Sequence, residues 1–432
     1  MAKLSRDPYK GTRDFYPEDQ FVQNHIFDVW KEVCHHYGFE EYNSSLLEET
    51  DLYAAKSGQE IVSQQTYSFI DRGERNVTIR PEMTPTFARM VAKKRMELPY
   101  PLRWFSIPNL WRYEQPQRGR LREHWQLNVD IAGANSLYAE AELIALSVDI
   151  MKKFGADPMN FVVKLNSRRL LSSFFTDVLK LDQDSSYALS KLIDKMHKIA
   201  KEEFKIEGMK LMSEEMFQKL LGFVQATDIK DLAHLLPVEF LQTNAGVVEL
   251  NHLFDILKKQ GITNTIFEPT LMRGFDYYTG IIFEIFDVNP ANSRSLFGGG
   301  RYDDLVGIFG VEPISCVGFG MGDVVIKDYL ETYGLMPEYK PSSMVYIGVI
   351  DEKNMGFALG LAQLLRDNNI GCAVELDVRK VDKQMKSADK MHIPYVCIIG
   401  DSEEQSGTFD LKNMSTGKAI SVTLATIISQ IT

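Results

Sequence analysis

The segment LMRGFDYYTG at residues 271–280 places polar side chains inside an apolar stretch that continues as IIFEIF. Its centre holds a cation, an acid and two phenols, namely Arg273, Asp276, Tyr277 and Tyr278. A buried polar group without a partner costs about 1–3 kcal/mol, and a buried unpaired charge costs more. The segment therefore indicates either a strand that holds a polar ligand or a structural Arg–Asp pair beside two core tyrosines.

A second set of polar residues occurs in HWQLNVDIA, which reads as a strand. Strand side chains alternate between two faces, so Gln126, Asn128 and Asp130 share one face and the apolar residues share the other. This row of polar residues predicts either the lining of a pocket or a solvated outer face, and the strand alone does not separate the two.

The loop before this strand is rich in arginine. It and its flanks contain Arg112, Arg118, Arg120 and Arg122, countered only by Glu114 and Glu123. Guanidinium groups bind phosphates through paired hydrogen bonds and keep their charge, so the loop favours phosphate binding. A solvated surface loop is the alternative.

Two shorter segments carry weaker signals. In TIRPEMTP, Glu82 and Thr84 could hold an ammonium group, although Thr84 before Pro85 is also typical of a helix cap, which this stretch alone favours. In GGGRYD (298–303), three glycines allow a ligand to approach the backbone. No phosphate-binding G-x-x-x-x-G-K-[ST] segment occurs, so a nucleotide would bind to a sheet with arginines.

The elements that must position these residues divide the chain, because 432 residues exceed what one core usually organises. We expect a core at 1–166 that resumes at 262–330. A Lys/Leu-rich helical insertion interrupts it at 167–261, and a linker follows at 331–343. Alternating strands and helices over 344–432 predict a small α/β domain.

Composition narrows the function classes. A net charge of −11 argues against a protein covered by nucleic-acid-binding surface, so any such binding must use local patches. The four cysteines lie far apart without C-x-x-C spacing, which favours reduced thiols over zinc ligands or disulfides. No apolar run approaches the roughly 18 residues of a membrane helix, and the first residues lack a secretory pattern. We therefore expect a cytoplasmic protein.

Taken in order, these segments resemble the histidyl-tRNA synthetase family of class II aminoacyl-tRNA synthetases. GTRDFYPED resembles the N-terminal segment, TIRPEMT the amino-acid-binding loop, and FSIPNLWRYEQPQRGRLREHWQLNVDIAG the motif 2 hairpin. LMRGFDYYTG and GGGRYDDLV are similar to the two signatures of the histidine enzymes. SCVGFGMG resembles the start of motif 3, and the tail resembles an anticodon-binding domain.

This resemblance implies an α/β fold with an α+β catalytic core. An antiparallel sheet flanked by helices would carry the site, followed by a helical insertion and a C-terminal α/β anticodon-binding domain. It also implies ATP-dependent attachment of L-histidine to tRNA(His) through a histidyl-adenylate, with release of pyrophosphate and AMP. ATP with Mg²⁺, tRNA(His) and a second copy of the chain in a homodimer are the implied partners, with no membrane.

The resemblance also carries residue roles. Arg273 and Arg112 correspond to the catalytic cations at the α-phosphate. The histidine-binding positions are Glu82, Thr84, Arg112, Gln126, Asp130, Arg273, Tyr277 and Tyr278. The ATP-binding positions are Arg112, Glu114, Arg120, Gly299, Gly300 and Arg301. No metal ligand is expected from the protein.

The chain departs from the family pattern at three positions. Asp130 stands where the family commonly has glutamate, and Ser45 stands at the proline of motif 1, which bears on the dimer geometry. Val325 stands where motif 3 usually has an arginine that contacts ATP. Either Arg301 or another cation takes over that contact, or ATP binds less tightly.

A catalytically inactive paralogue is the second interpretation. Such a protein would act as a histidine-sensing regulatory subunit of ATP phosphoribosyltransferase. That regulatory family generally lacks the C-terminal domain and the catalytic arginines, whereas this chain has both a tail and the arginines Arg112 and Arg273. The valine at position 325, in place of the motif 3 arginine, favours this second interpretation.

Overall fold

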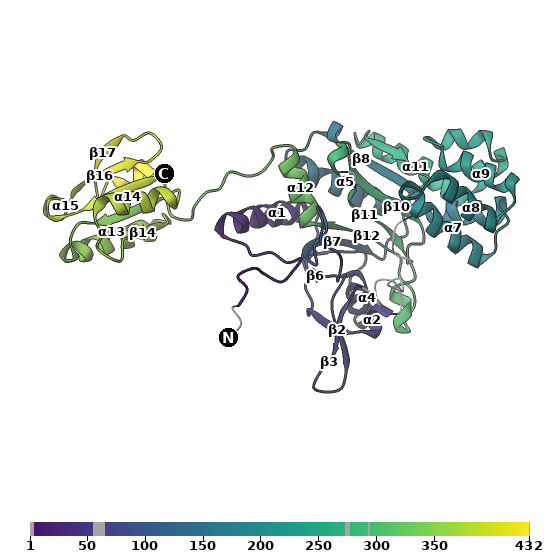
Figure 1. Cartoon of the computed structure of the whole chain (residues 1–432), viewed down its shortest axis with the longest axis horizontal. Helices are drawn as coiled ribbons and strands as arrows, with labels where there is room; N and C mark the ends of the chain where they lie inside the picture. Colours follow the sequence, from purple (N-terminus) through teal and green to yellow (C-terminus); the bar gives the residue numbers. More distant parts are fainter. Residues whose placement is uncertain (1–3, 55–64, 273–276, 293, 432) are drawn as a thin grey trace. The chain divides into compact units, whose positions relative to one another are not determined.

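A computed structural model describes residues 4–54, 65–272, 277–292 and 294–431. It divides into two compact units, Met1–Pro337 and Glu338–Thr432 (Figure 1). The division falls inside the segment predicted as a linker. Arg273 and Asp276 of the LMRGFDYYTG segment lie outside the described residues.

The first unit is organised by one large sheet, which has nine strands in the described residues. Its order is β1-β5-β7-β12-β11-β10-β8-β9, with β6 paired to β7. The middle of the sheet is antiparallel, and only the edge pairs β1–β5 and β8–β9 are parallel. The fold class predicted from the sequence is therefore confirmed. The strands are β1 (Glu40–Glu41), β5 (Leu102–Ser106), β6 (Asn109–Trp111), β7 (Glu123–Ala132), β8 (Phe161–Ser167), β9 (Thr265–Phe267), β10 (Ile281–Asp287), β11 (Ser295–Tyr302) and β12 (Cys316–Gly322).

Helices cover one face of this sheet with a continuous apolar core. In α1, Ile26, Trp30 and Val33 recur at helical spacing and are buried, so they form the face that packs inward. They join Leu127 and Val129, the apolar side of β7, in the same cluster. The covering helices are α1 (Pro17–His36), α5 (Tyr138–Lys153) and α12 (Asp323–Thr332).

The opposite face carries a smaller cluster and leaves room for a site. Phe87 and Val91 of α4 pack there with Tyr302 of β11, beside a three-stranded sheet in the order β2-β4-β3. Because side chains alternate along β7, this is the face to which Gln126, Asn128 and Asp130 belong. The elements on this side are β2 (Leu47–Glu49), α2 (Asp51–Ala54), β3 (Tyr67–Ile70), β4 (Asn76–Ile79), α4 (Thr84–Lys93) and the 3₁₀ turn η6 (Val306–Phe309).

The segment between β8 and β9 is helical. Side chains of Asp182, Ser213 and Asn244 accept backbone hydrogen bonds at three helix starts, and Phe174 stacks on Phe223 with ring centroids 4.0 Å apart. The chain then returns to the sheet as β9. The elements are α6 (Arg168–Ser173), η2 (Phe174–Val178), α7 (Gln183–Lys195), η3 (Met196–Lys198), α8 (Lys201–Leu211), α9 (Glu214–Val224), η4 (Ile229–His234), α10 (Val238–Thr243) and α11 (Ala245–Lys259).

The second unit is a small α/β domain around a five-stranded sheet in the order β14-β13-β15-β16-β17. The pairs β14–β13 and β13–β15 are parallel, and the pairs β15–β16 and β16–β17 are antiparallel. Leu361 and Leu365 of α13 lie in the core of this unit. The elements are β13 (Val345–Val349), α13 (Met355–Asp367), β14 (Cys372–Val374), α14 (Val381–Lys390), β15 (Tyr395–Ile399), α15 (Asp401–Ser406), β16 (Thr408–Asn413), β17 (Ala419–Thr423) and α16 (Ile427–Ile431).

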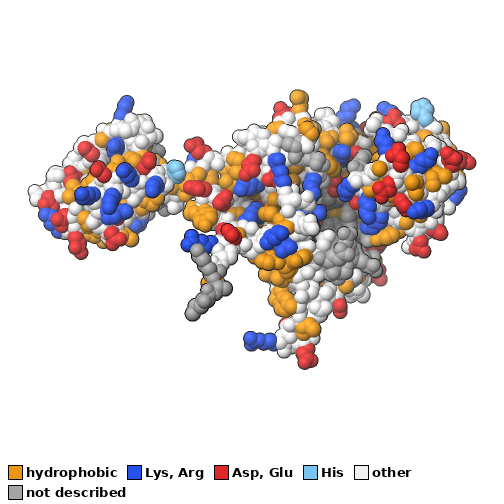
Figure 2. Space-filling model, viewed as in Figure 1, with side chains coloured by type: hydrophobic (Ala, Val, Ile, Leu, Met, Phe, Trp, Pro, Cys, Tyr) orange, Lys and Arg blue, Asp and Glu red, His pale blue; other side chains and the backbone are white. Residues whose placement is uncertain are grey.

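The surface mixes charges of both signs. Figure 2 shows acidic and basic side chains interspersed over the visible face of the protein. The mixture fits the expectation that any binding of nucleic acid uses local patches. No helix in the part of the chain that the structure describes is long and apolar enough to cross a membrane.

Candidate active site

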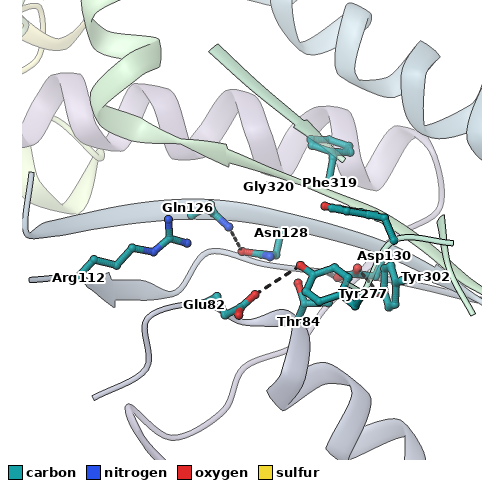
Figure 3. Close-up of a pocket in the computed structure, with 12 residues that line it drawn as sticks. Glu82, Thr84, Arg112, Gln126, Asn128, Asp130, Tyr277, Tyr302, Phe319 and Gly320 are labelled. Atoms are coloured by element: carbon teal, nitrogen blue, oxygen red, sulfur yellow. Dashed lines mark hydrogen bonds between the residues drawn. The ribbon is translucent and has the colours of Figure 1, made fainter. Parts of the chain in front are cut away.

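A pocket of about 140 Å³ opens on the face of the sheet opposite α1. It brings together seven of the residues assigned to histidine from the sequence, although they come from four separate segments of the chain (Figure 3). The assigned residues in its lining are Glu82, Thr84, Arg112, Gln126, Asp130, Tyr277 and Tyr278. The remaining lining residues are Asn128, Tyr302, Gly318, Phe319 and Gly320.

Glycines of β12 make the floor of this pocket. Gly318 is the cross-strand partner of Asp130, and Gly320 is the partner of Asn128. A Cβ atom on Gly318 would lie 2.0 Å from Asp130 Oδ1, and one on Gly320 would lie 2.4 Å from Gln126 Nε2. The alternating glycines of SCVGFGMG therefore leave the space that the polar row of β7 occupies.

Asp130 closes one end of the pocket. Its side chain is 2% exposed, and the Tyr302 hydroxyl donates a hydrogen bond to Oδ1. The other oxygen, Oδ2, is buried and has no hydrogen-bond partner within the described residues. Burial raises the pKa of Asp130 to about 7, against the opposing effect of the Tyr302 hydrogen bond. The pocket thus ends in a carboxylate oxygen that lacks a donor.

Tyr277 and Tyr278 form one wall. Their ring centroids are 4.9 Å apart, and the Tyr277 hydroxyl donates to Glu82 Oε2 at 3.4 Å. The sequence predicted a strand through both tyrosines, which was wrong, because β10 begins only at Ile281. Adjacent residues of a strand point to opposite faces, so both rings line the same pocket only because they precede the strand.

Thr84 does not cap a helix. It is the first residue of α4, Met83 occupies the cap position, and no side chain caps that end. The capping interpretation of TIRPEMTP was therefore wrong, and Thr84 lines the pocket instead. Glu82 lies beside it and is buried.

Arg112 lies at the other end of the pocket, away from Asp130 (Figure 3). It follows β6, and its Nε donates to the carbonyl oxygen of Pro81 at 2.8 Å. Its backbone N–H donates to Arg122 O at 2.8 Å, which fixes it to the base of the hairpin. The hydrogen bond from Nε therefore fixes the orientation of the guanidinium group. The same bond ties the hairpin to the loop that carries Glu82.

The hairpin arginines have different environments. Arg120 pairs with Glu114, with 2.5 Å between Nε and Oε2. Arg122 donates to the carbonyl oxygen of Glu114 and to the Tyr9 hydroxyl, and its guanidinium lies 4.1 Å from the Tyr113 ring centre. Arg122 thus braces the hairpin against the N-terminal segment, whereas Arg120 and Glu114 remain candidates for contact with ATP.

Arg301 is placed outside the pocket. Its guanidinium forms a two-point ion pair with Glu140, at 2.5 and 2.6 Å, and also donates to Ala134 O and to Ser315 Oγ. The side chain is buried among these acceptors. Its assignment to ATP stays a prediction, but these bonds direct the guanidinium to α5 and away from the pocket.

Gly299 and Gly300 serve close packing within the sheet. A Cβ atom on Gly299 would lie 1.9 Å from Gly318 O. One on Gly300 would lie 2.9 Å from Tyr278 Cδ1. Neither glycine is among the lining residues of this pocket, and their contact with ATP stays a prediction.

Several pocket residues were not assigned from the sequence. Tyr302 was part of GGGRYD, and Gly318 and Gly320 alternate in SCVGFGMG, so the alternation could have indicated a glycine floor.

His124 continues the polar row toward Arg112. Burial lowers its pKa to about 3, and the nearby charges of Arg112, Arg13 and Arg120 act in the same direction. This imidazole is therefore neutral at pH 7.

No group of three His, Cys, Asp or Glu side chains that could hold a metal ion occurs among the described residues. All four cysteines carry free thiols.

Comparison with known proteins agrees with this geometry. Residues 11–322 match the histidyl-tRNA synthetase family, and residues 344–432 match the anticodon binding domain family. The chain belongs to the histidyl-tRNA synthetase family. A histidine–tRNA ligase of Leptospira biflexa is 44% identical over 96% of this chain and 94% of its own length.

Solved structures show the same fold. A histidyl-tRNA synthetase from Nostoc matches with a TM-score of 0.83 and 23% identity, over 99% of both chains. A protein from Bacillus halodurans described as an ATP phosphoribosyltransferase regulatory subunit/histidyl-tRNA synthetase matches with a TM-score of 0.77, over 92% of this chain. At 23% identity, these two comparisons establish the fold alone.

Proposed function

We propose that this member of the family is a histidine–tRNA ligase and that the pocket between Asp130 and Arg112 binds L-histidine and the α-phosphate of ATP. The observation that carries the site assignment is Asp130 Oδ2, a buried acceptor without a donor at the closed end of a polar pocket. A buried acceptor costs free energy unless a ligand supplies the missing hydrogen bond. The N–H group of an imidazole does so.

The other polar groups suit the remaining parts of histidine. Tyr277 and Tyr278 flank the imidazole, Asp130 accepts from one ring nitrogen, and phenol hydroxyls can satisfy the other. The carboxylate of Glu82, with the oxygen atoms of Thr84 and Gln126, holds the ammonium group. An amino acid without an imidazole leaves Asp130 unsatisfied, which is how such a pocket rejects it.

Arg112 then faces the reacting groups. A carboxylate oxygen of histidine attacks the α-phosphorus, the new C–O–P bond forms, and the bond to the bridging oxygen breaks to release pyrophosphate. Negative charge develops on the phosphoryl oxygens, and a cation that is already oriented lowers this barrier. The bond from Nε to Pro81 O provides that orientation. By resemblance, Arg273 supplies a second cation.

The second step transfers the histidyl group. A ribose hydroxyl at the 3′ end of tRNA(His) attacks the carbonyl carbon, an ester forms, and AMP leaves with its phosphate. His124 lies near Arg112 and Arg120. Because its imidazole is neutral, it adds no positive charge to this end of the site. Glu114 and Arg120 contact ATP at this end.

Mg²⁺ enters this scheme only together with ATP. Protein-bound Mg²⁺ usually takes one or two carboxylates plus substrate phosphates, and Glu114 is the carboxylate beside the hairpin arginines. Among the described residues, no group of three or more His, Cys, Asp or Glu side chains is arranged to hold a metal ion. The described residues therefore fit an ion that neutralises phosphate charge while bound to the nucleotide.

The remaining assignments are also proposals. The unit that matches the anticodon binding domain family contacts tRNA. The segments 1–166 and 262–330 form the catalytic core, which the helical insertion 167–261 interrupts. We further propose a cytoplasmic homodimer, in which Ser45 takes the place of the motif 1 proline. The carbonyl oxygens of Ser44 and Ser45 accept bonds from buried Arg80, which holds this segment without a proline.

The regulatory-paralogue interpretation is not favoured, because the curated relatives are ligases and the tail is present. An ATP–pyrophosphate exchange assay with all twenty amino acids tests the function. We expect exchange with histidine alone. Absence of exchange with every amino acid would contradict the proposal, and exchange with another amino acid would contradict the pocket assignment.

A further inference from the structure

A buried amide, Asn128, lines the pocket between a residue proposed for the ammonium group and the residue proposed for the imidazole. It lies on β7 between Gln126 and Asp130, and its side chain is 3% exposed. Its register partners on the neighbouring strands are Ser106 of β5 and Gly320 of β12, which belong to the same face of the sheet. Asn128 is therefore held in the middle of the pocket wall.

One hydrogen bond links this amide to its neighbour. Gln126 Nε2 donates to Asn128 Oδ1 at 2.9 Å (Figure 3). A Cβ atom on Gly320 would lie 2.4 Å from Gln126 Nε2 but 3.4 Å from Gln126 Oε1. The nitrogen of the Gln126 amide therefore faces Asn128 and the glycine floor, and its oxygen lies farther from that floor.

This bond is not part of the architecture of the sheet. Gln126 and Asn128 are two positions apart on one strand, so the bond joins no separate elements. The backbone of Gln126 is held independently, because its N–H donates to Pro108 O at 3.2 Å and its strand is paired with β12. The consequence of the bond is therefore local: it fixes the direction of the Gln126 side chain.

The direction of an amide decides what it can bind. An amide has an acceptor on one side and two N–H donors on the other, whereas an ammonium group has only donors. Two neighbouring amides can bond in two ways, and in the second way Asn128 Nδ2 would donate to Gln126 Oε1. That arrangement would turn the N–H groups of Gln126 toward a ligand, whereas the arrangement in the structure leaves Oε1 for it.

We propose that Asn128 is a positioning residue for histidine: by accepting from Nε2, it directs Gln126 Oε1 at the ammonium group. The proposal rests on the proposed function for the identity of the ligand. Figure 3 shows Glu82 and Thr84 on the other side of the pocket. An ammonium group has three N–H donors, and Glu82, Thr84 and the oriented Gln126 supply an acceptor for each.

The test compares histidine with imidazolepropionate, which is histidine without its amino group. Calorimetric titration of the full-length Asn128→Leu protein, without ATP, should show histidine affinity about tenfold weaker than wild type. Leucine has nearly the size of asparagine but no acceptor, so bound histidine would force Gln126 Nε2 against methyl groups. Affinity for imidazolepropionate should change by less than about twofold, because that ligand does not use the Gln126 amide.

Two further variants separate orientation from packing. Asn128→Asp keeps the size of the side chain and supplies acceptors, so it should hold the amide in the required direction and bind histidine within about threefold of wild type. Ser106→Ala is the matched control, because Ser106 lies beside Asn128 in the register of β5 and β7. Both ligands should bind this control as they bind wild type.

Kinetics provide an independent measurement. In pyrophosphate exchange, Asn128→Leu should raise the KM for histidine about tenfold and leave the KM for ATP unchanged, because the affected group contacts only the amino acid. Thermal unfolding of each variant, measured in parallel, verifies that it is folded.

Three results would overturn the proposal. Equal weakening of histidine and imidazolepropionate by Asn128→Leu would show that Asn128 supports the pocket as a whole, and unchanged histidine affinity would remove the role. A loss in Asn128→Asp as large as that in Asn128→Leu would show that the acceptor is not what matters. Wild-type protein that binds neither ligand would instead contradict the proposed function, so the two failures are distinguishable.

Discussion

The two ends of the active site are built in different ways. At the Asp130 end, the carboxylate lies in the centre of the sheet, held by Tyr302 and by the missing side chain of Gly318. At the end proposed for ATP, guanidinium groups lie on a hairpin loop, and Arg118 is exposed. One end is part of the packed sheet, whereas the other end lies on the hairpin that β6 forms with β7.

We interpret this difference as a separation between the selection of histidine at one end and catalysis at the other. A buried carboxylate with a fixed environment discriminates between side chains, because an unsatisfied group there costs the full desolvation penalty. Arginines on a loop neutralise a charged, flexible substrate and tolerate its movement. Substitutions in the sheet should therefore affect histidine binding and stability together, and substitutions in the loop should affect ATP without affecting stability.

The largest expected effect is at the junction of the two ends. Arg112→Gln should lower histidine-dependent pyrophosphate exchange by about 10²–10³-fold, because it removes an oriented cation from the phosphoryl group. Arg112→Lys should recover only part of this, since lysine cannot bond Pro81 O and a phosphate in the same geometry. Arg103→Gln, an arginine paired with Glu142 outside the pocket, is the control. Near-normal exchange in Arg112→Gln would contradict the role.

The glycine floor gives the next largest effect. Gly318→Ala puts a methyl group against Asp130 Oδ1 and should raise the KM for histidine roughly 30-fold, equivalent to about 2 kcal/mol. Gly322→Ala is a matched control on the same strand, because its Cβ would meet no atom within 4 Å. Similar KM values in both variants, measured on folded protein, would show that the floor does not position Asp130.

The pH dependence of stability tests the Asp130 end directly. Burial raises the pKa of Asp130 from 3.8 to about 7, so the folded protein keeps this acid protonated up to a higher pH than the unfolded chain does. This contribution to stability is complete below about pH 4 and is lost as the pH rises to about 7. The Asp130→Asn side chain does not titrate, so this variant does not lose stability as the pH rises. The Tm of the variant minus the Tm of wild type should therefore be roughly 2–4 °C larger at pH 8 than at pH 5.

Thermal unfolding of both proteins across this pH range is the measurement. A constant difference in Tm between wild type and Asp130→Asn would contradict the raised pKa. The same substitution should raise the KM for histidine and leave the KM for ATP nearly unchanged, because Asp130 lies away from Arg112.

The smallest expected effect lies in the second unit. Lys383, Lys386 and Lys390 are exposed at helical spacing on α14, whereas Arg379 is engaged by Glu375. Replacing the three lysines by alanine should raise the KM for tRNA several-fold and flatten its salt dependence, since fewer counterions are released. Histidine-dependent pyrophosphate exchange should not change. Unaltered aminoacylation at every salt concentration would contradict tRNA contact by this helix.

Local sequence was sufficient for much of the candidate site. Alternation along β7 predicted that Gln126 and Asp130 share a face, and the structure places both in the pocket. In α1, Ile26, Trp30 and Val33 recur at helical spacing, and all three are buried. Such features depend on residues a few positions apart, so the spacing of polar and apolar residues along one segment is enough to predict them.

Other features depended on partners far away in the chain. The fold places Glu140 against Arg301, although Glu140 lies 161 positions earlier in the chain, and no local pattern predicted this ion pair. Thr84 looked like a helix cap until the loop before α4 placed its side chain in the pocket. In each case a contact between distant parts of the chain, which the sequence does not display, set the surroundings of the side chain.

The sequence by itself therefore determined which side chains are available: a polar row on one strand, an arginine-rich loop, paired tyrosines and alternating glycines. Only the tertiary structure decided which of them meet. Antiparallel register set Gly318 opposite Asp130, and the return of the chain from the helical segment brought Tyr302 to the same carboxylate. The physical reason is that register and packing are satisfied across the whole sheet at once, whereas periodicity is read along a single segment.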